Sequence, residues 1–184
     1  VALHDGYKAR VQDVDGNEYV DWIGCLGANP LGYSNDHVNE RVARAVAGGA
    51  SFSLPHYSEV EVAERLCEKI PCAEMVRFVN SGSEATEAAI RTARIATGRD
   101  KILTIKTGYH SWHSWFQAVK DWHPGVPKSH EWLITGINYN DKTMLHDLLH
   151  TGVYAALIME PTLFEPPDPD YLELARDCCS DKGT

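Results

Sequence analysis

The spacing of hydrophobic and polar positions divides this chain into a β-rich beginning, two helices and a longer alternating region. Residues 11–14 and 18–23, which contain valine, isoleucine and aromatic residues, flank the turn sequence Asp15-Gly16-Asn17, and this predicts a β-hairpin. Helical spacing predicts one helix over residues 36–47 and another over residues 58–70. The second helix opens with the capping-box pattern of Ser58 and Glu61.

After Pro71 the chain alternates between apolar strands and amphipathic helices. We predict strands over residues 75–79, 101–105, 132–135 and 154–159, and helices over residues 84–97, 142–149 and after Asp168-Pro169. This alternation predicts a mostly parallel sheet of an α/β protein, whose ligands bind at the carboxyl ends of the strands. Ser81 and Glu160 both fall at such ends.

Composition and charge narrow the classes of function. The 184 residues are 43% hydrophobic and 23% charged, as in an ordinary globular protein, and the formal net charge is -9. An acidic chain lacks the basic face that nucleic acids and anionic membranes require, so we expect neither as a partner. No apolar run approaches the length of a membrane span.

The cysteines and the chain ends give two further expectations. Scattered cysteines without a C-x-x-C pair favour reduced thiols and predict a cytoplasmic location; they are Cys25, Cys67, Cys72, Cys178 and Cys179. The chain begins at Val1 and stops at Thr184, where a helix is expected to lead into another strand. We therefore expect it to be part of a longer protein.

The turn Ser81-Gly82-Ser83 lies between an apolar strand and a helix, which is the arrangement of an anion site. The first N–H groups of a helix have no partner within the helix, and the helix dipole favours negative charge there. Gly82 permits close approach, and the two serines add hydroxyl donors. The alternative is an ordinary helix start, because Ser81 and Glu84 have capping-box spacing.

Two further groups of residues follow strands. Tyr109 and His110 belong to an aromatic run over residues 108–115, which suits stacking on a flat ring, while a partly buried aromatic loop is the plain alternative. A metal site at His110 and His113 is less favoured, because no carboxylate or cysteine completes it nearby. Glu160 follows an apolar strand and is expected to be hydrogen-bonded or salt-bridged, with a direct substrate role as the alternative.

Taken in order, these motifs resemble the class-III, fold-type-I aminotransferases that use pyridoxal 5'-phosphate (PLP), above all the glutamate-1-semialdehyde aminomutase-like branch. The segments that carry the resemblance span nearly the whole chain: residues 13–21, 76–85, 93–94, 97–102, 108–110 and 158–161. The resemblance implies a three-layer α/β sandwich. Residues 51–184 would be the N-terminal part of the PLP-binding large domain, preceded by a segment of residues 1–50 with the hairpin and first helix.

The resemblance also implies roles for individual residues. Gly82 and Ser83, with Ser81 beside them, match the turn that holds the PLP phosphate. Tyr109 matches the aromatic residue that stacks on the pyridine ring, and His110 lies next to it.

Substrate residues follow from the resemblance less directly. Glu165 falls where relatives place a polar or acidic active-site residue. Leu26 stands where the aminomutase has a substrate-pocket tryptophan, and Ser111 stands where the family usually has glycine. The leucine at position 26 makes the aminomutase's own substrate a doubtful one for this protein.

The activity implied is transfer of an amino group between an amine and a carbonyl compound through a Schiff base, in a homodimer. The lysine that forms the Schiff base is expected beyond Thr184, so the chain alone is expected to be inactive. Two alternatives stay open: a catalytically dead fragment or pseudoenzyme that acts as a dimer partner, and another phosphate-binding α/β protein. Both would lack that lysine.

Overall fold

The computed structural model describes residues 2–162 and 164–184. It forms two compact units, residues 1–75 and residues 76–184, which are described separately below. The division expected between residues 50 and 51 lies inside the first unit and stays a prediction. No helix among the described residues is both long and apolar enough to cross a membrane.

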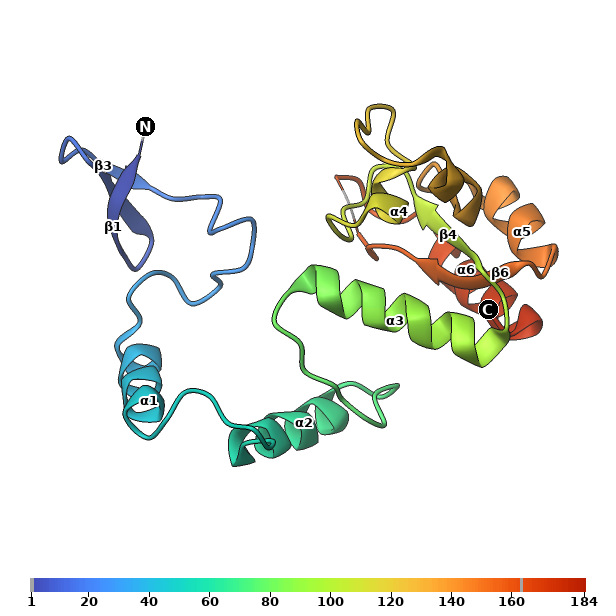
Figure 1. Cartoon of the computed structure of the whole chain (residues 1–184). Helices are drawn as coiled ribbons and strands as arrows, with labels where there is room; N and C mark the ends of the chain where they lie inside the picture. The colour runs from blue at the N-terminus through green and yellow to red at the C-terminus, as the bar shows by residue number, and fades with distance from the viewer. Residues whose placement is uncertain (1, 163) are drawn as a thin grey trace. The chain divides into compact units, whose positions relative to one another are not determined.

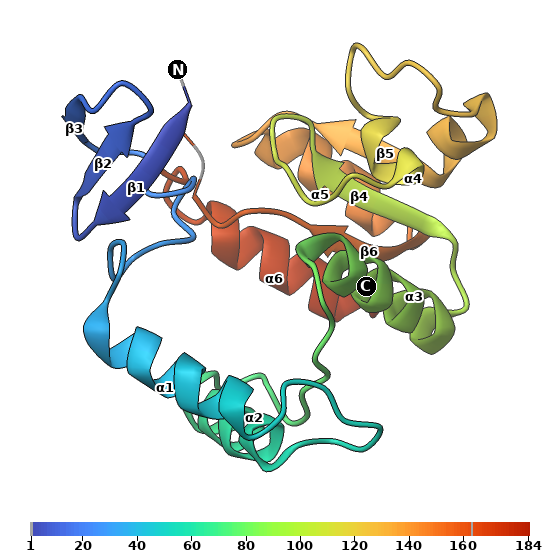
Figure 2. The same ribbon diagram turned by 60° about the vertical axis from the view of Figure 1, so that its left-hand side comes forward.

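The first unit holds a small antiparallel sheet and two helices. Its elements are β1 (Leu3–Tyr7), β2 (Arg10–Asp13), β3 (Glu18–Val20), α1 (Asp36–Ala47) and α2 (Tyr57–Lys69). The strands pair in the order β1-β2-β3, as the blue ribbon in Figure 2 shows, and the β2–β3 hairpin is the predicted one. At its turn, the buried carboxylate of Asp13 accepts the backbone N–H of Asn17 at 2.9 Å.

Helix α1 has the predicted bounds, but the predicted capping box of α2 is wrong. The helix begins at Tyr57, and His56 is its N-cap, with its Nδ1 accepting the backbone N–H of Ser58 at 3.3 Å. Because the His56 side chain caps this N–H group, the helix begins at Tyr57, one residue before Ser58.

The second unit contains the parallel sheet. Its elements are α3 (Gly82–Thr97), β4 (Lys101–Ile105), α4 (Ser114–Gln117), the 3-10 helix η1 (Lys128–Leu133), β5 (Ile134–Ile137), α5 (Lys142–His150), β6 (Tyr154–Ile158) and α6 (Tyr171–Lys182). The strand order is β5-β4-β6, and β4 pairs in parallel with both neighbours. The prediction of an α/β fold with a parallel sheet is confirmed.

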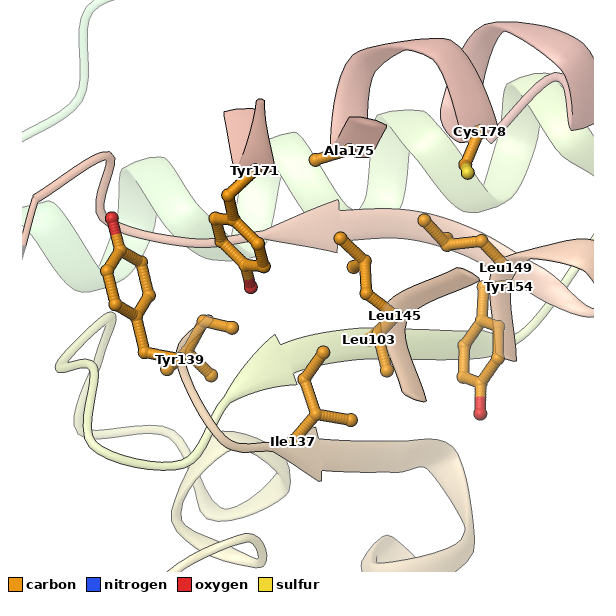
Figure 3. Close-up of a cluster of buried hydrophobic side chains, with 10 residues drawn as sticks. Leu103, Ile137, Tyr139, Leu145, Leu149, Tyr154, Tyr171, Ala175 and Cys178 are labelled. Carbon is orange, nitrogen blue, oxygen red and sulfur yellow. The ribbon is translucent and has the colours of Figure 1, made fainter. Parts of the chain in front are cut away.

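Helices cover both faces of this sheet, which gives three layers (Figure 1). Successive residues of β4 point to opposite faces: Ile102 packs with Ile90 of α3, whereas Leu103 packs with residues of α5 and α6. Figure 3 shows the second of these cores, where Leu145 and Tyr171 lie between the helices and the sheet. The buried strands explain why their sequences are almost continuously apolar.

In the second unit, the clearest differences from the predictions concern residues 75–79, β5 and α6. Residues 75–79 form no strand, because no other described strand pairs with them, and Met75 is 89% exposed. Strand β5 begins two residues later than predicted, because Trp132 and its neighbours belong to η1. Helix α6 begins at Tyr171 rather than directly after Asp168-Pro169, because Asp170 takes a left-handed conformation with φ 66°.

Candidate functional site

The turn before α3 forms the capping box that its sequence permits. Ser81 is the N-cap, and its Oγ accepts the backbone N–H of Glu84 at 3.2 Å. The Glu84 carboxylate accepts the N–H groups of Asn80 at 2.6 Å and Ser81 at 3.1 Å. The alternative interpretation of this turn, an ordinary helix start with a capping box, is therefore correct for the hydrogen bonds of Ser81 and Glu84.

The capping box nevertheless leaves two backbone N–H groups at the start of the helix without an acceptor in the described part of the chain. Within the described residues, the N–H groups of Gly82 and Ser83 have no acceptor. A Cβ atom built on Gly82 would meet nothing within 4 Å, so open space lies beside these groups. Free N–H groups at the start of a 16-residue helix favour an anion, since the dipole adds to their partial charges.

The loop after β4 is attached to this turn through Ser83. The backbone N–H of Trp112 donates to Ser83 Oγ at 3.2 Å, and His113 Nε2 lies 3.0 Å from the Ser83 carbonyl oxygen. Because Ser83 Oγ accepts from Trp112, its own hydroxyl proton can be donated to a further acceptor. Ser111, at the position where the resemblance implies glycine, is buried, and its Oγ accepts the His113 N–H at 3.0 Å.

The same loop presents Tyr109 and His110. The Tyr109 backbone N–H donates to Glu160 Oε1 at 3.2 Å, while its side chain is 65% exposed and offers an accessible ring. Glu160 thus meets the expectation that it is hydrogen-bonded. The sheet edge therefore brings together the start of α3, the loop after β4 and the carboxylate after β6.

His110 is held differently, with its ring against the core. The ring packs edge-on to Phe116 at a centroid distance of 4.7 Å, and its buried Nε2 has no partner among the described residues. Burial lowers the pKa of His110; the Glu160 carboxylate opposes this shift, and the Lys120 ammonium adds to it. The half-buried imidazole of His110 thus has one buried nitrogen without a described partner, and this nitrogen lies against Gly108.

The lowered pKa of His110 predicts a pH dependence of stability. The unfolded state takes up this proton near pH 6.5, above the pKa of the folded state. The histidine's contribution to stability is therefore complete above pH 6.5 and is lost as the pH falls towards the folded-state pKa. Thermal melts of the wild type and of His110→Asn at several pH values between about 5 and 8 test this. The variant should lose less stability on acidification; equal losses would contradict the assignment.

The two predicted substrate residues lie on loops. Glu165 is exposed and lies between β6 and α6, in a loop anchored to the segment after β5. Tyr139 Oη donates to the Pro161 carbonyl oxygen at 2.6 Å, and Asn140 Nδ2 donates to that of Pro166 at 3.2 Å. Leu26 belongs to the first unit, where its side chain is 92% exposed. Their substrate roles stay predictions.

Two functional features were missed or differently interpreted from sequence. The sequence does not predict the contact of His113 with the turn before α3, and no described group of three or more His, Cys, Asp or Glu side chains could hold a metal ion. Lys120 contacts the loop that carries Tyr109 and was not singled out. No local pattern marks it, because its partners are backbone carbonyl groups.

Comparison with known proteins decides the family. The model of the family described as aminotransferase class-III matches residues 2–184. The chain belongs to the class-III aminotransferases. The resemblance predicted from the motifs is thereby confirmed, and with it the mixed α/β fold of these enzymes.

Individual class-III relatives agree. The chain is 36% identical over 200 residues to glutamate-1-semialdehyde 2,1-aminomutase 2 of Shouchella clausii (strain KSM-K16), covering all of this chain and 46% of that protein. An omega-transaminase from Sphaerobacter thermophilus superposes with a TM-score of 0.94 at 27% identity, over 99% of this chain and 46% of its own. A structure described as a transaminase with PLP bound superposes with a TM-score of 0.93 at 30% identity, over 100% of this chain and 47% of its own. The chain thus spans about half the length of these relatives.

Proposed function

We propose that this chain supplies the phosphate-binding and ring-stacking part of a PLP-dependent aminotransferase or aminomutase. The observation that carries the proposal is the pair of free N–H groups at Gly82 and Ser83, beside a loop with an exposed Tyr109 ring. The Gly82 and Ser83 N–H groups and the Ser83 hydroxyl would bind the phosphate, with Ser81 alongside. Tyr109 would stack on the pyridine ring.

The donors of the site suit PLP. A phosphate dianion needs several N–H and O–H donors and no nearby unpaired carboxylate, and Glu84 is occupied by the N–H groups of Asn80 and Ser81. A pyridine ring needs an apolar or aromatic face, which Tyr109 offers.

When bound, PLP supplies an electron sink for the substrate carbon from which a proton is removed. The residues of this chain position the cofactor for that chemistry. The helix start fixes one end through the phosphate, and the stacked Tyr109 ring keeps water from one face. Because His110 is neutral at pH 7, it adds no positive charge next to the ring.

The reaction proposed for the whole protein is transfer of an amino group between an amine and a carbonyl compound. Its support is the family membership and the relatives named above, of which this chain covers 46 to 47%. Glu165 and Leu26 are the proposed substrate contacts. A homodimer and a cytoplasmic location are proposed with it, the second supported by five free cysteines.

Titration of the protein expressed from its complete coding sequence with PLP tests the function. The expected result is a yellow, protein-bound absorbance that changes when an amino donor is added and returns when a carbonyl acceptor follows. Absence of any protein-bound absorbance would contradict the proposal. Bound PLP that no amino donor alters would leave the cofactor site standing and favour the non-catalytic alternative.

A further inference from the structure

Lys120 lies in the turn after α4, and its ammonium contacts the loop that carries Tyr109 and His110. Its Nζ donates to the carbonyl oxygen of Lys106 at 2.6 Å and to that of Gly108 at 2.5 Å. Lys106 directly follows the last residue of β4, and Gly108 directly precedes Tyr109. Among the described residues, no other group donates a hydrogen bond to either of these carbonyl oxygens.

The opposite side of the loop is held by a carboxylate. Glu160 accepts the Tyr109 N–H at 3.2 Å, so the peptide units around Tyr109 are bound by a cation through their oxygens and by an anion through a nitrogen. Charge-assisted hydrogen bonds of this kind are about twice as strong as neutral ones. A loop bound in this way presents its side chains in a fixed direction.

We propose that Lys120 is a positioning residue, which holds the loop of residues 106–110 so that the exposed Tyr109 ring meets the PLP ring. Lys120 itself needs no contact with the cofactor. This inference rests on the proposed function, since it concerns how the same site receives the ring rather than the phosphate.

The surroundings of Lys120 agree with such a role. Burial lowers the pKa of its ammonium group, and the Glu160 carboxylate opposes this shift. Half-burial of a charged lysine is costly, and here the cost is offset by the hydrogen bonds to main-chain oxygens and by the Glu160 carboxylate. A methionine here would keep the apolar stem and leave both carbonyl oxygens without the donor.

The experiment compares Lys120→Met with wild type in the complete protein, and uses Lys128→Met, an exposed lysine of η1, as the matched control. Hydrogen exchange of the Gly108 and Tyr109 amides should become faster in Lys120→Met, while exchange in β6 is unchanged. The Kd for PLP should rise about tenfold or more, as expected on loss of charge-assisted contacts. The Kd for inorganic phosphate should stay within about twofold, because the helix start is intact.

Lys120→Arg keeps a cation and should restore most of the lost protection, which a purely space-filling role would not predict. If Lys120→Met fails to fold, Lys120→Gln, which keeps an N–H donor but loses the charge, tests the contribution of the cation. Unchanged exchange at Gly108 and Tyr109 together with an unchanged Kd for PLP would overturn the role of Lys120. Such a result would leave the proposed function intact, provided that wild type binds PLP; a wild type that does not bind PLP would overturn both.

Discussion

Replacing Gly82 by proline is expected to leave α3 folded and to remove most of the affinity of the complete protein for PLP. Gly82 is the first residue of the helix, a position where proline is well tolerated because its missing N–H has no helical partner. Ser81 before it is extended, with ψ 158°, as a residue preceding proline must be. A Cβ atom at Gly82 would meet nothing within 4 Å.

The change thus deletes one hydrogen-bond donor and little else. A hydrogen bond to a charged group contributes about 1.5–3 kcal/mol, so the Kd for PLP should rise by about tenfold to a hundredfold. Gly82→Ala is the matched control, since it keeps the N–H and should bind PLP nearly as wild type does. Equal affinities of the proline and alanine variants, measured by fluorescence titration, would show that this N–H does not hold the phosphate.

The second large effect is expected at Gly108, where the backbone of the loop passes close to His110. A Cβ atom at this position would lie 2.8 Å from His110 Nε2 and 3.4 Å from the Ile105 carbonyl oxygen. The His110 ring is packed on Phe116, so Gly108→Ala must displace it. Overpacking of this kind costs about 1–3 kcal/mol in the free energy of unfolding, and the variant should also bind PLP more weakly.

A double-mutant cycle identifies the cause. His110→Ala removes the ring that the new methyl group would meet, so alanine at position 108 should cost much less in that background. We expect a coupling of about 1 kcal/mol or more between the two changes, measured by chemical denaturation. Additive effects would mean that the cost of Gly108→Ala arises from the backbone and not from His110.

The sequence predicted most of the fold because the relevant signals are local. Residues 101–105 are rich in apolar and β-branched side chains and form β4 with the predicted bounds, and α1 likewise matches its helical spacing. The capping-box spacing of Ser81 and Glu84 likewise appears as a pair of hydrogen bonds. Where a few neighbouring residues decide the conformation, their pattern is sufficient.

The predictions that differ depend on partners far away in the chain. Residues 75–79 are apolar enough for a strand, but a strand exists only through pairing, and the described chain provides none for them. The contact of His113 with Ser83 joins residues 30 positions apart, and that of Lys120 with Gly108 joins a side chain to a backbone oxygen. Neither contact produces a periodic or spaced pattern in the sequence from which it could be predicted.

The central claim is that the start of α3 binds the phosphate of PLP. The most direct measurement compares PLP with pyridoxal, which lacks the phosphate, as ligands of the complete wild-type protein and of Gly82→Pro. Wild type should bind PLP at least about a hundredfold more tightly than pyridoxal, and the proline variant should lose much of that preference. An equal preference for PLP in both proteins would contradict the account.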